Sequence, residues 1–411
     1  MKYRSAGSSL LVLLALLGCQ KGCDRVTRAL QRQVSQAVSD EVKAPTLQPV
    51  TEAEASAFGA AMLAGIESRD AEAIQQLVDF PTVVTRSLAG MRLPMKEVLE
   101  TAAGVAKGAR KSGFVAQLAA MRDSNTLCSV LPDRVDREGR WVRVRVLPAS
   151  GGLEHYDFLL TKRADGSVAA ADVFFLTVGE EMSISLRRLL IGAFALDKTF
   201  VESLGAEDSL VVKHLEELNG VRTAQMGGRH EEALTILDGL PEELRTQKFV
   251  LLMRMQSLGQ NTKDPRYAEC IGTLVERYPD DPAATFAAID YYFLKQDYAK
   301  SLEAVNAVEK AAGGDPYFGV LKSNLLADMG RLAEARQVAL ATIEREPDLL
   351  AAHLSLVNAL VRQKDHAGAA RQLLRVRKQF AWIPAFESVP VYAAFVASPE
   401  YRVLQKEWAR D

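Results

Sequence analysis

Cysteine is scarce in this 411-residue sequence, and the positions of its four cysteines argue against a disulfide framework. Cys19 and Cys23 are too close together to close a useful loop, and Cys128 and Cys270 stand in separate segments without a regular spacing. A Cys-x3-Cys pair with no histidine or further cysteine nearby is also a poor zinc site. The fold must therefore be stabilised by burial of apolar side chains.

An excess of charge of one sign is also absent. The formal net charge is −2, the loss of Lys2 and Arg4 would make it more negative, and the chain has no run of Lys and Arg. Nucleic acid is therefore not an expected partner. The chain also lacks a Gly-rich phosphate loop or a metal-ligand spacing, so no cofactor is predicted. Hydrophobic residues make up 48% of the sequence, which is enough to bury two cores of ordinary size.

Long apolar runs are missing as well, apart from one near the start of the chain. Every residue from Leu10 to Leu17 is apolar, and Lys2 and Arg4 precede the run. A membrane-spanning helix needs roughly 20 such residues, so this run is too short to cross a bilayer. A basic start followed by a short apolar run is typical of a secretion signal.

The residues that close this run, Leu16-Leu17-Gly18-Cys19, resemble the lipobox of bacterial lipoproteins. The resemblance implies that residues 1–18 are a signal peptide and that Cys19 becomes the lipidated N-terminus. Gln20 resembles the version that is sorted to an outer membrane, so we expect a lipid-anchored cell-envelope protein facing the periplasm. Two or more acyl chains hold a protein stably, since each buried methylene contributes about 0.8 kcal/mol. An ordinary signal peptide or an uncleaved segment is the alternative, and Cys23 is interpreted as incidental.

Residues 19–50 are predicted to be the lipidated N-terminus and a linker. A four-residue spacing of apolar positions places one narrow stripe on a helix, formed by Val26, Leu30, Val34, Val38 and Val42. Pro45 and Pro49 then end the helix. We interpret the segment as a stalk, and a short partner-binding helix is the alternative.

Between residues 51 and 200 the pattern changes from helical to strand-like. Thr51 and Glu54 form a candidate capping box before a helical stretch. Two further helical stretches follow, AEAIQQLVDF and MKEVLETAAGVAKG, with the β-like PTVVTRS between them. Three strand patterns come next: RWVRVRVLP, HYDFLLTKR and VAAADVFFLT. Asp165-Gly166 predicts a tight hairpin turn, because this pair tolerates positive φ angles. Helices followed by an antiparallel meander predict an α+β domain.

This element order, together with HYDFLLTKRADGSVAAADVFFLTVGE, resembles the nuclear transport factor superfamily, whose cone-shaped domains wrap a curved sheet around a long helix. Some members of that superfamily are enzymes with an Asp or His inside the cone, and others are binding or structural modules. His155 and Asp157 share one strand face here, and Asp172 lies among apolar residues. These three side chains are candidates for a cone pocket. The alternative is that they are satisfied structural groups.

From Val212 onward, helical periodicity replaces the strand signals and the sequence repeats every 34 residues. With unit starts at His214, Lys248, Pro282, Pro316 and Leu350, the twentieth position holds Ala233, Tyr267, Ser301, Ala335 and Ala369. The twenty-fourth position holds Leu237, Ile271, Val305, Ala339 and Leu373. Small residues recur where two helices would cross, and aliphatic ones where a helix would face its neighbour. The period fits a helix-turn-helix unit.

The segments MGGRHEEALTIL, KQDYAKSLEAV, MGRLAEARQVAL and RQKDHAGAARQLL resemble the turn and second helix of the tetratricopeptide repeat. The resemblance implies five repeats over residues 212–381, and residues 382–411 are expected to cap the solenoid. Tyr267 departs from the small-residue slot, which raises the question of a register slip of one residue. The first-helix glycine slot departs too, and it holds Val221, Met255, Ile289, Ser323 and Val357.

The resemblance also implies that the ninth residue of each unit points into a concave groove. These residues are all polar: Arg222, Gln256, Asp290, Asn324 and Asn358. Apolar contacts beside them are expected from Phe249, Phe286, Tyr317 and Leu354. Because asparagine both donates and accepts hydrogen bonds, such a row suits the backbone of an extended peptide. The alternative is that a concave face exposed to water is polar in any case.

The sequence therefore predicts an α+β cone-like domain followed by an all-α tetratricopeptide-repeat solenoid. We expect a membrane-anchored interaction scaffold that binds a protein or peptide partner, and we do not expect an enzyme. One alternative is a cone domain that binds a small ligand or catalyses a reaction with His155 and Asp157. Another is a lipoprotein that helps to assemble outer-membrane proteins or secretins.

Overall fold

The computed structural model describes residues 41–121, 126–148, 152–195, 198–202, 204–259, 264–381, 386 and 389–408. The predicted signal peptide, Cys19, Cys23 and the stalk as far as residue 40 lie outside the described residues. The chain divides into two compact units, Met1–Ala287 and Ala288–Asp411, and each is considered by itself. Within the described residues, none of the helices is both long enough and apolar enough to cross a bilayer.

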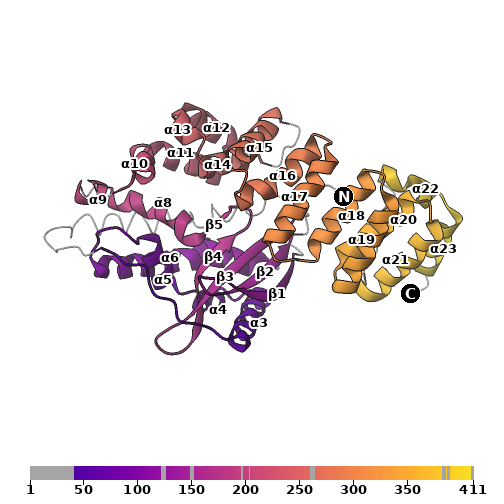
Figure 1. The fold of residues 1–411 in the computed structure, drawn as a ribbon, viewed down its shortest axis with the longest axis horizontal. Helices are drawn as coiled ribbons and strands as arrows, with labels where there is room; N and C mark the ends of the chain where they lie inside the picture. Colours follow the sequence, from indigo (N-terminus) through magenta and orange to yellow (C-terminus); the bar gives the residue numbers. More distant parts are fainter. Residues whose placement is uncertain are drawn as a thin grey trace. The chain divides into compact units, whose positions relative to one another are not determined.

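The first part of the Met1–Ala287 unit is an α+β domain (Figure 1). Its helices are α3 (Glu52–Ser68), α4 (Ala71–Gln76), α5 (Phe80–Ser87), α6 (Met95–Ser112), α7 (Phe114–Ala120), α8 (Met182–Phe194), α9 (Lys198–Glu202) and α10 (Ala206–Lys213). Its strands are β1 (Leu127–Val135), β2 (Arg140–Leu147), β3 (Glu154–Lys162), β4 (Val168–Phe175) and β5 (Glu180–Glu181). The five strands form one antiparallel meander in the order β1-β2-β3-β4-β5, so the expected α+β arrangement is confirmed.

The predicted capping box at the start of α3 is present. The Thr51 side chain accepts from the Glu54 N–H, and the Glu54 carboxylate accepts from the Thr51 N–H at 2.9 Å. Each group therefore satisfies a backbone donor that the first helical turn leaves without a partner.

The segment PTVVTRS was predicted to be β-like, and this prediction is wrong, because the residues form helix α5. The Asp79 side chain accepts from the Thr82 N–H and caps the helix, and Pro81 lies in the first turn, where no helical N–H is required. Val83 and Val84 are then both fully buried. Burial of two adjacent valines outweighs their weak preference against helix.

The three predicted strands are confirmed as β2, β3 and β4. The hairpin between β3 and β4 is less tight than predicted, because only Gly166 has a positive φ (82°). Asp165 contributes instead by accepting from the N–H and hydroxyl of Ser167. β1 was not predicted, since Pro132 interrupts its pattern and its pairing with β2 shifts between Leu131 and Arg134.

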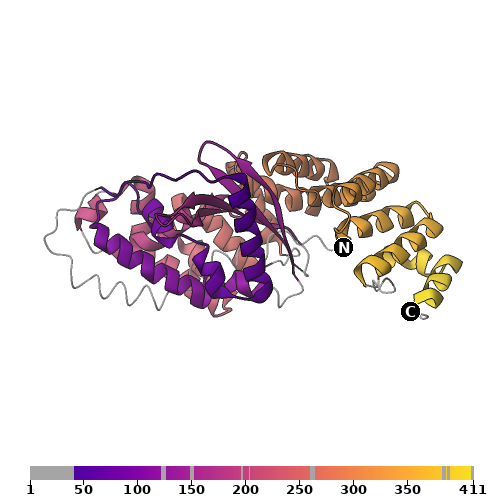
Figure 2. The same ribbon diagram turned by 90° about the horizontal axis from the view of Figure 1, so that it is seen from below.

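The core of the α+β domain lies between the sheet and its helices. Helix α3 contacts β1 and β2, and Figure 2 shows it, in indigo, against the strands. Gly59 permits this close approach, because a Cβ there would stand 2.8 Å from Val130 Cγ1. Aromatic rings fill the interior, with the Phe114 ring 5.8 Å from Tyr156 and 5.6 Å from Phe175.

Residues 41–50 are part of this domain, whereas the sequence led us to include them in the linker. Val42 and Val50 are buried, and Val42 exchanges backbone hydrogen bonds with Gly90 and Met91. The Gln48 N–H donates to the Thr161 hydroxyl at 2.9 Å. The prolines that were expected to end a free helix therefore belong to an extended strap on the domain surface.

Among the described residues after α10, the regular elements are all helices, as predicted. The helices are α11 (Leu215–Met226), α12 (His230–Gly239), α13 (Glu242–Arg245), α14 (Lys248–Leu258), α15 (Pro265–Arg277), α16 (Pro282–Leu294), α17 (Tyr298–Ala311), α18 (Tyr317–Asp328), α19 (Leu332–Arg345), α20 (Leu350–Arg362) and α21 (His366–Phe380). The twentieth and twenty-fourth residues of all five units are buried. Tyr267 is buried and Ala268 is only half-buried, so the second unit keeps its register.

Two serines allow paired helices to pack closely at the first-helix glycine slot, which holds Ile289 in one unit and Ser323 in the next. The Ser301 hydroxyl of α17 donates to the Ile289 carbonyl of α16 at 2.8 Å. In the next unit, the Ser323 hydroxyl of α18 donates to the Ala335 carbonyl of α19 at 2.8 Å. Both serines are fully buried. A small hydroxyl that reaches the facing backbone thus lets each helix pair cross closely.

The end of the chain covers the last apolar face of the repeats. The short elements η2 (Pro390–Tyr392), α22 (Ala393–Val396) and α23 (Pro399–Trp408) follow α21. Phe395 and Tyr401 are buried, and they pack in one cluster with Leu360 and Leu373. A stacked array needs such a cover, because its terminal repeat would otherwise expose an apolar face.

Candidate functional site

The ninth residues of the five units all lie on first helices, but they are less open than expected. Arg222, Gln256 and Asn358 are half-buried. Asp290 and Asn324 are more enclosed, with only 9% and 7% of their surface exposed to solvent. The sequence pattern therefore identified one equivalent position in each unit. It did not indicate that two of these side chains would be enclosed by their neighbours.

In the Ala288–Asp411 unit, two of these residues belong to a connected polar row, which we name the amide row: Asn324, Asp328, Asn358 and Arg362. The Asn358 side-chain amide donates to Asn324 Oδ1 at 3.3 Å. Arg362 donates to Asn358 Oδ1 at 3.2 Å and to Asp328 Oδ1 at 2.6 Å. The row thus runs along α18 and α20 and joins two neighbouring units.

Sequence reasoning missed Arg362 and Asp328. Arg362 stands four residues after Asn358, so it lies on the same face of α20 one turn further on. It also donates to the Ala327 carbonyl at 3.0 Å, which places it over the end of α18. The i, i+4 spacing could have identified the residue, but the partner that it finds on α18 depends on how the helices cross.

The apolar residues expected beside the groove fall into two groups. Phe249 and Phe286 are buried, so the prediction that they offer contact to a partner is wrong for this structure. The Phe249 ring lies beneath the Arg188 guanidinium, 4.9 Å from the ring centroid, and serves internal packing. Tyr317 and Leu354 are half-buried and keep part of their surface exposed.

The three candidate residues of the cone pocket are all buried in the sheet. His155 and Asp157 lie on β3 opposite Arg145 and Arg143 of β2, and they share one face as predicted. The Asp157 carboxylate accepts two hydrogen bonds from Arg143, at 2.6 and 2.5 Å. Such a bidentate pair fixes the position and orientation of the carboxylate.

Asp172 on β4 belongs to a second charge cluster. Its carboxylate accepts from Arg86 Nε at 2.8 Å and from the Ser183 N–H at 3.0 Å. The same guanidinium binds Glu181 at 3.0 Å. Burial raises the pKa of Asp172, although Arg86 opposes the shift. Burial, and then the nearby Asp172, raise the pKa of Glu181.

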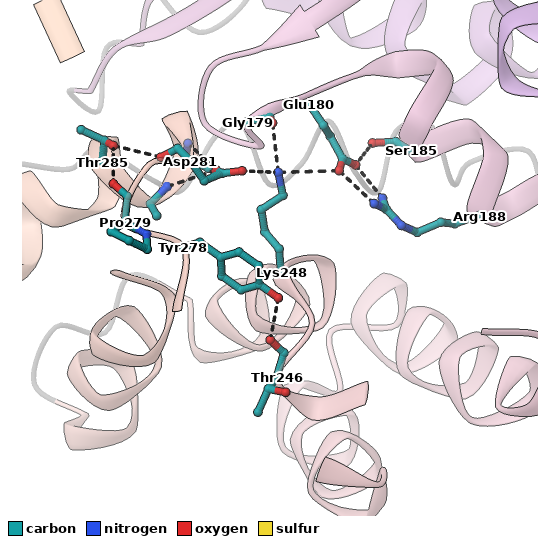
Figure 3. A network of polar contacts seen from close by, with 12 residues as sticks. Gly179, Glu180, Ser185, Arg188, Thr246, Lys248, Tyr278, Pro279, Asp281 and Thr285 are labelled. Carbon is teal, nitrogen blue, oxygen red and sulfur yellow. Dashed lines mark hydrogen bonds and ion pairs between the residues drawn. The ribbon is translucent and has the colours of Figure 1, made fainter. Parts of the chain in front are cut away.

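A third polar network joins the α+β domain to the first repeats, and we name it the junction network (Figure 3). Lys248, at the start of α14, donates to the Gly179 carbonyl at 3.0 Å and to Asp281 Oδ2 at 2.7 Å. Its ammonium also lies 3.9 Å from Glu180, which Arg188 binds at 2.7 and 3.0 Å. The turn after β4 is thereby tied to two helices of the repeats.

Gly179 is required at this junction for two reasons. Its φ of +67° lies in the left-handed region, and a Cβ there would stand 2.4 Å from Asp281 Oδ1. The same Asp281 oxygen accepts from the Ala283 N–H at 2.8 Å at the start of α16. A side chain at position 179 would therefore disturb the beginning of that helix.

Comparison with known proteins supports the repeats and nothing further. A family model for the tetratricopeptide repeat matches residues 268–316 and 320–380. The chain therefore contains tetratricopeptide repeats, which serve in general as protein–protein interaction scaffolds. No curated protein and no solved structure matches the chain. In the described residues, no group of three or more His, Cys, Asp or Glu side chains could hold a metal ion.

Proposed function

We propose that this chain is a lipid-anchored cell-envelope protein whose repeats bind an extended polypeptide. The observation that carries the binding proposal is the amide row, where Asn324, Asn358 and Arg362 are ordered on successive first helices. A polypeptide backbone offers both donors and acceptors, and an amide side chain can pair with either. Tyr317 and Leu354 supply apolar surface on the same helices.

A crosslinking experiment tests the groove directly. A photo-reactive residue replaces Leu354 on first helix α20 or, as the matched control, Leu340 on second helix α19, which is 47% exposed. We expect a discrete adduct from position 354 in intact cell envelopes and none from position 340. Mass spectrometry then identifies the crosslinked peptide. Equal crosslinking from both positions, or none from position 354, contradicts the proposal.

A substitution in the amide row provides a second, quantitative test of peptide binding. Asn358→Ala removes hydrogen bonds that are each worth about 1 kcal/mol, so the crosslinking yield at subsaturating partner should fall roughly fivefold. Asn306→Ala is the control, because Asn306 is exposed on second helix α17. An unchanged yield in the Asn358 variant would mean that the row serves only the packing of α18 on α20.

The lipid anchor rests on the sequence Leu16-Leu17-Gly18-Cys19 and is tested separately. Cells fed a labelled fatty acid should incorporate the label into the wild-type chain and into the Cys23→Ser variant. The Cys19→Ser variant should lose both the label and its place in the membrane fraction. Label that persists after Cys19→Ser would show that the lipobox interpretation is wrong.

We further propose that the α+β domain is a structural module of the nuclear transport factor type rather than an enzyme or a domain that binds a small ligand. Support comes from the side chains considered for chemistry, since Asp157 is held by Arg143 and Asp172 by Arg86. A carboxylate whose oxygens already accept hydrogen bonds from an arginine has fewer lone pairs left to bind a substrate. A soluble small-molecule ligand that stabilises the wild-type chain but not Asp157→Asn would favour the enzyme or ligand-binding alternative.

A further inference from the structure

The second helix of the last repeat carries an unusual concentration of positive charge. Helix α21 contains Arg371, Arg375, Arg377 and Lys378 and no acidic residue. Three of these, Arg371, Arg375 and Lys378, are exposed and stand at i, i+4 and i+7. This spacing aligns them in one stripe, which we name the basic ridge, while the buried residues Leu373 and Val376 lie on the opposite side.

Several exposed cations of the same unit are paired with carboxylates, unlike those of the basic ridge. Arg331 is paired with Glu334 at 2.6 Å, and Arg336 lies 3.7 Å from Asp365. In the part of the chain that the structure describes, no ion pair involves Arg371, Arg375 or Lys378. The charges of the ridge are therefore not neutralised within the described residues, and they can act together on a partner.

We propose that the basic ridge binds the surface of a membrane that contains anionic phospholipid. The exposed stripe carries long cationic side chains and no large exposed apolar residue, which suits contact with headgroups without insertion. The interaction is superficial and depends on salt, because exposed charges are screened within about 10 Å at 0.1 M ionic strength. A lipid anchor elsewhere in the chain would raise the effective concentration of such a weak contact.

The expected size of the effect follows from the number of charges. Each basic side chain near an anionic surface strengthens binding roughly fivefold, so the three together contribute about 100-fold. This is too weak to hold an untethered protein permanently. A 100-fold contribution is enough to orient the last repeat towards the membrane when the protein is already tethered there.

The test measures the partition of the full chain, carrying Cys19→Ser to remove acylation, onto vesicles. Vesicles of phosphatidylcholine alone are compared with vesicles that contain one third phosphatidylglycerol. We expect the Cys19→Ser chain to bind more strongly to the anionic vesicles. This preference should fall about 100-fold when Arg371→Ala, Arg375→Ala and Lys378→Ala are added, and it should fall by the same amount in the Cys19→Ser chain at 1 M salt.

The matched control removes the same charge elsewhere, with Lys310→Ala on α17, Arg331→Ala just before α19 and Arg336→Ala on α19. It should keep the preference for anionic vesicles. Equal losses in both triple variants would mean that net charge rather than the ridge is responsible, which overturns the proposal. Binding of the ridge to soluble polyglutamate with no preference between vesicles would assign it to an acidic polypeptide and overturn the proposal as well. Because acylation is absent throughout, the result does not depend on the anchor or on the peptide groove.

Discussion

The α+β domain and the repeats place polar groups in their interiors in different ways. In the α+β domain, buried carboxylates are matched by arginines, as in Arg86 with Asp172 and Arg143 with Asp157. In the repeats, buried polar side chains are mostly neutral, and Ser301 and Ser323 donate to backbone carbonyls across a helix pair. The sheet domain thus depends on a few buried ion pairs, one of which joins residues 86 apart in sequence, whereas the repeats depend on neutral hydrogen bonds between neighbouring helices.

This difference determines how much stability a substitution should cost and how far its effect should extend. A buried charge that loses its partner costs several kcal/mol, because water cannot replace the lost interaction. Loss of a buried serine hydrogen bond in a repeat lowers the free energy of unfolding by about 1 kcal/mol, and the effect is confined to that repeat and the repeats next to it. The four predictions below test this contrast, from the largest effect to the smallest.

The largest effect is expected from Arg86→Met, which leaves Asp172 without its cation while that carboxylate is fully buried. The free energy of unfolding should fall by about 3 kcal/mol. Arg331→Met is the control, because Arg331 and Glu334 are both exposed and water screens their ion pair, so its loss should change the free energy of unfolding little. Urea denaturation measures both, and equal losses would show that burial does not set the cost.

The second effect concerns the junction network. Gly179→Ala introduces strain at φ +67° and a clash with Asp281, so it should destabilise the chain by about 2 kcal/mol. Gly166→Ala is matched in backbone strain, with φ +82°, but nothing lies within 4 Å of its added Cβ. It should cost about 1 kcal/mol. Thermal unfolding that ranks the two variants in the opposite order would contradict the role given to Asp281.

The third effect lies in the repeats. Ser323→Ala removes the hydrogen bond to the Ala335 carbonyl but keeps a small side chain, so the loss should be about 1 kcal/mol. Hydrogen exchange should show faster opening of α18 and α19 and unchanged protection in the α+β domain. Faster exchange throughout the sheet would mean that the repeats are not the local structures described above.

The smallest effect is a pH dependence at the start of α3. Hydrogen bonds from the Thr51 backbone and from Lys162 lower the pKa of Glu54 from 4.5 to about 2. Because the folded-state pKa is lowered, this contribution to stability is present above pH 4.5 and disappears as the pH falls through 2. Glu54→Gln should therefore be less stable than wild type at pH 6, and the difference should shrink towards pH 2. Glu52→Gln, which leaves the capping box intact, should show no such convergence.

Much of the repeat architecture could be predicted, because its information is local. A unit of 34 residues repeats its pattern, and the twentieth and twenty-fourth positions are buried in all five units. Even where Tyr267 replaces a small residue, the register holds. The partners of the groove position were not predictable, since the contact between Asn358 and Arg362 on α20 and the end of α18 depends on the crossing of two helices.

In the α+β domain the sequence was a weaker guide. PTVVTRS has β-branched residues typical of a strand, but its burial as α5 outweighs that preference. β1 contains a proline and a shifted register, and it becomes a strand only because β2 offers it a partner. The candidates His155, Asp157 and Asp172 are all buried, but the arginines that hold Asp157 and Asp172 were not foreseen.

The sequence by itself determined the helical period of the second half and the three central strands. These features follow from patterns that repeat every two, three to four, or 34 residues, and a chain displays such patterns before it folds. Only the tertiary structure decided which charges meet, as Arg86 and Asp172 do across 86 residues and Lys248 and Asp281 do across 33. The physical reason is that ion pairing depends on distance in space, and no short-range pattern records that distance.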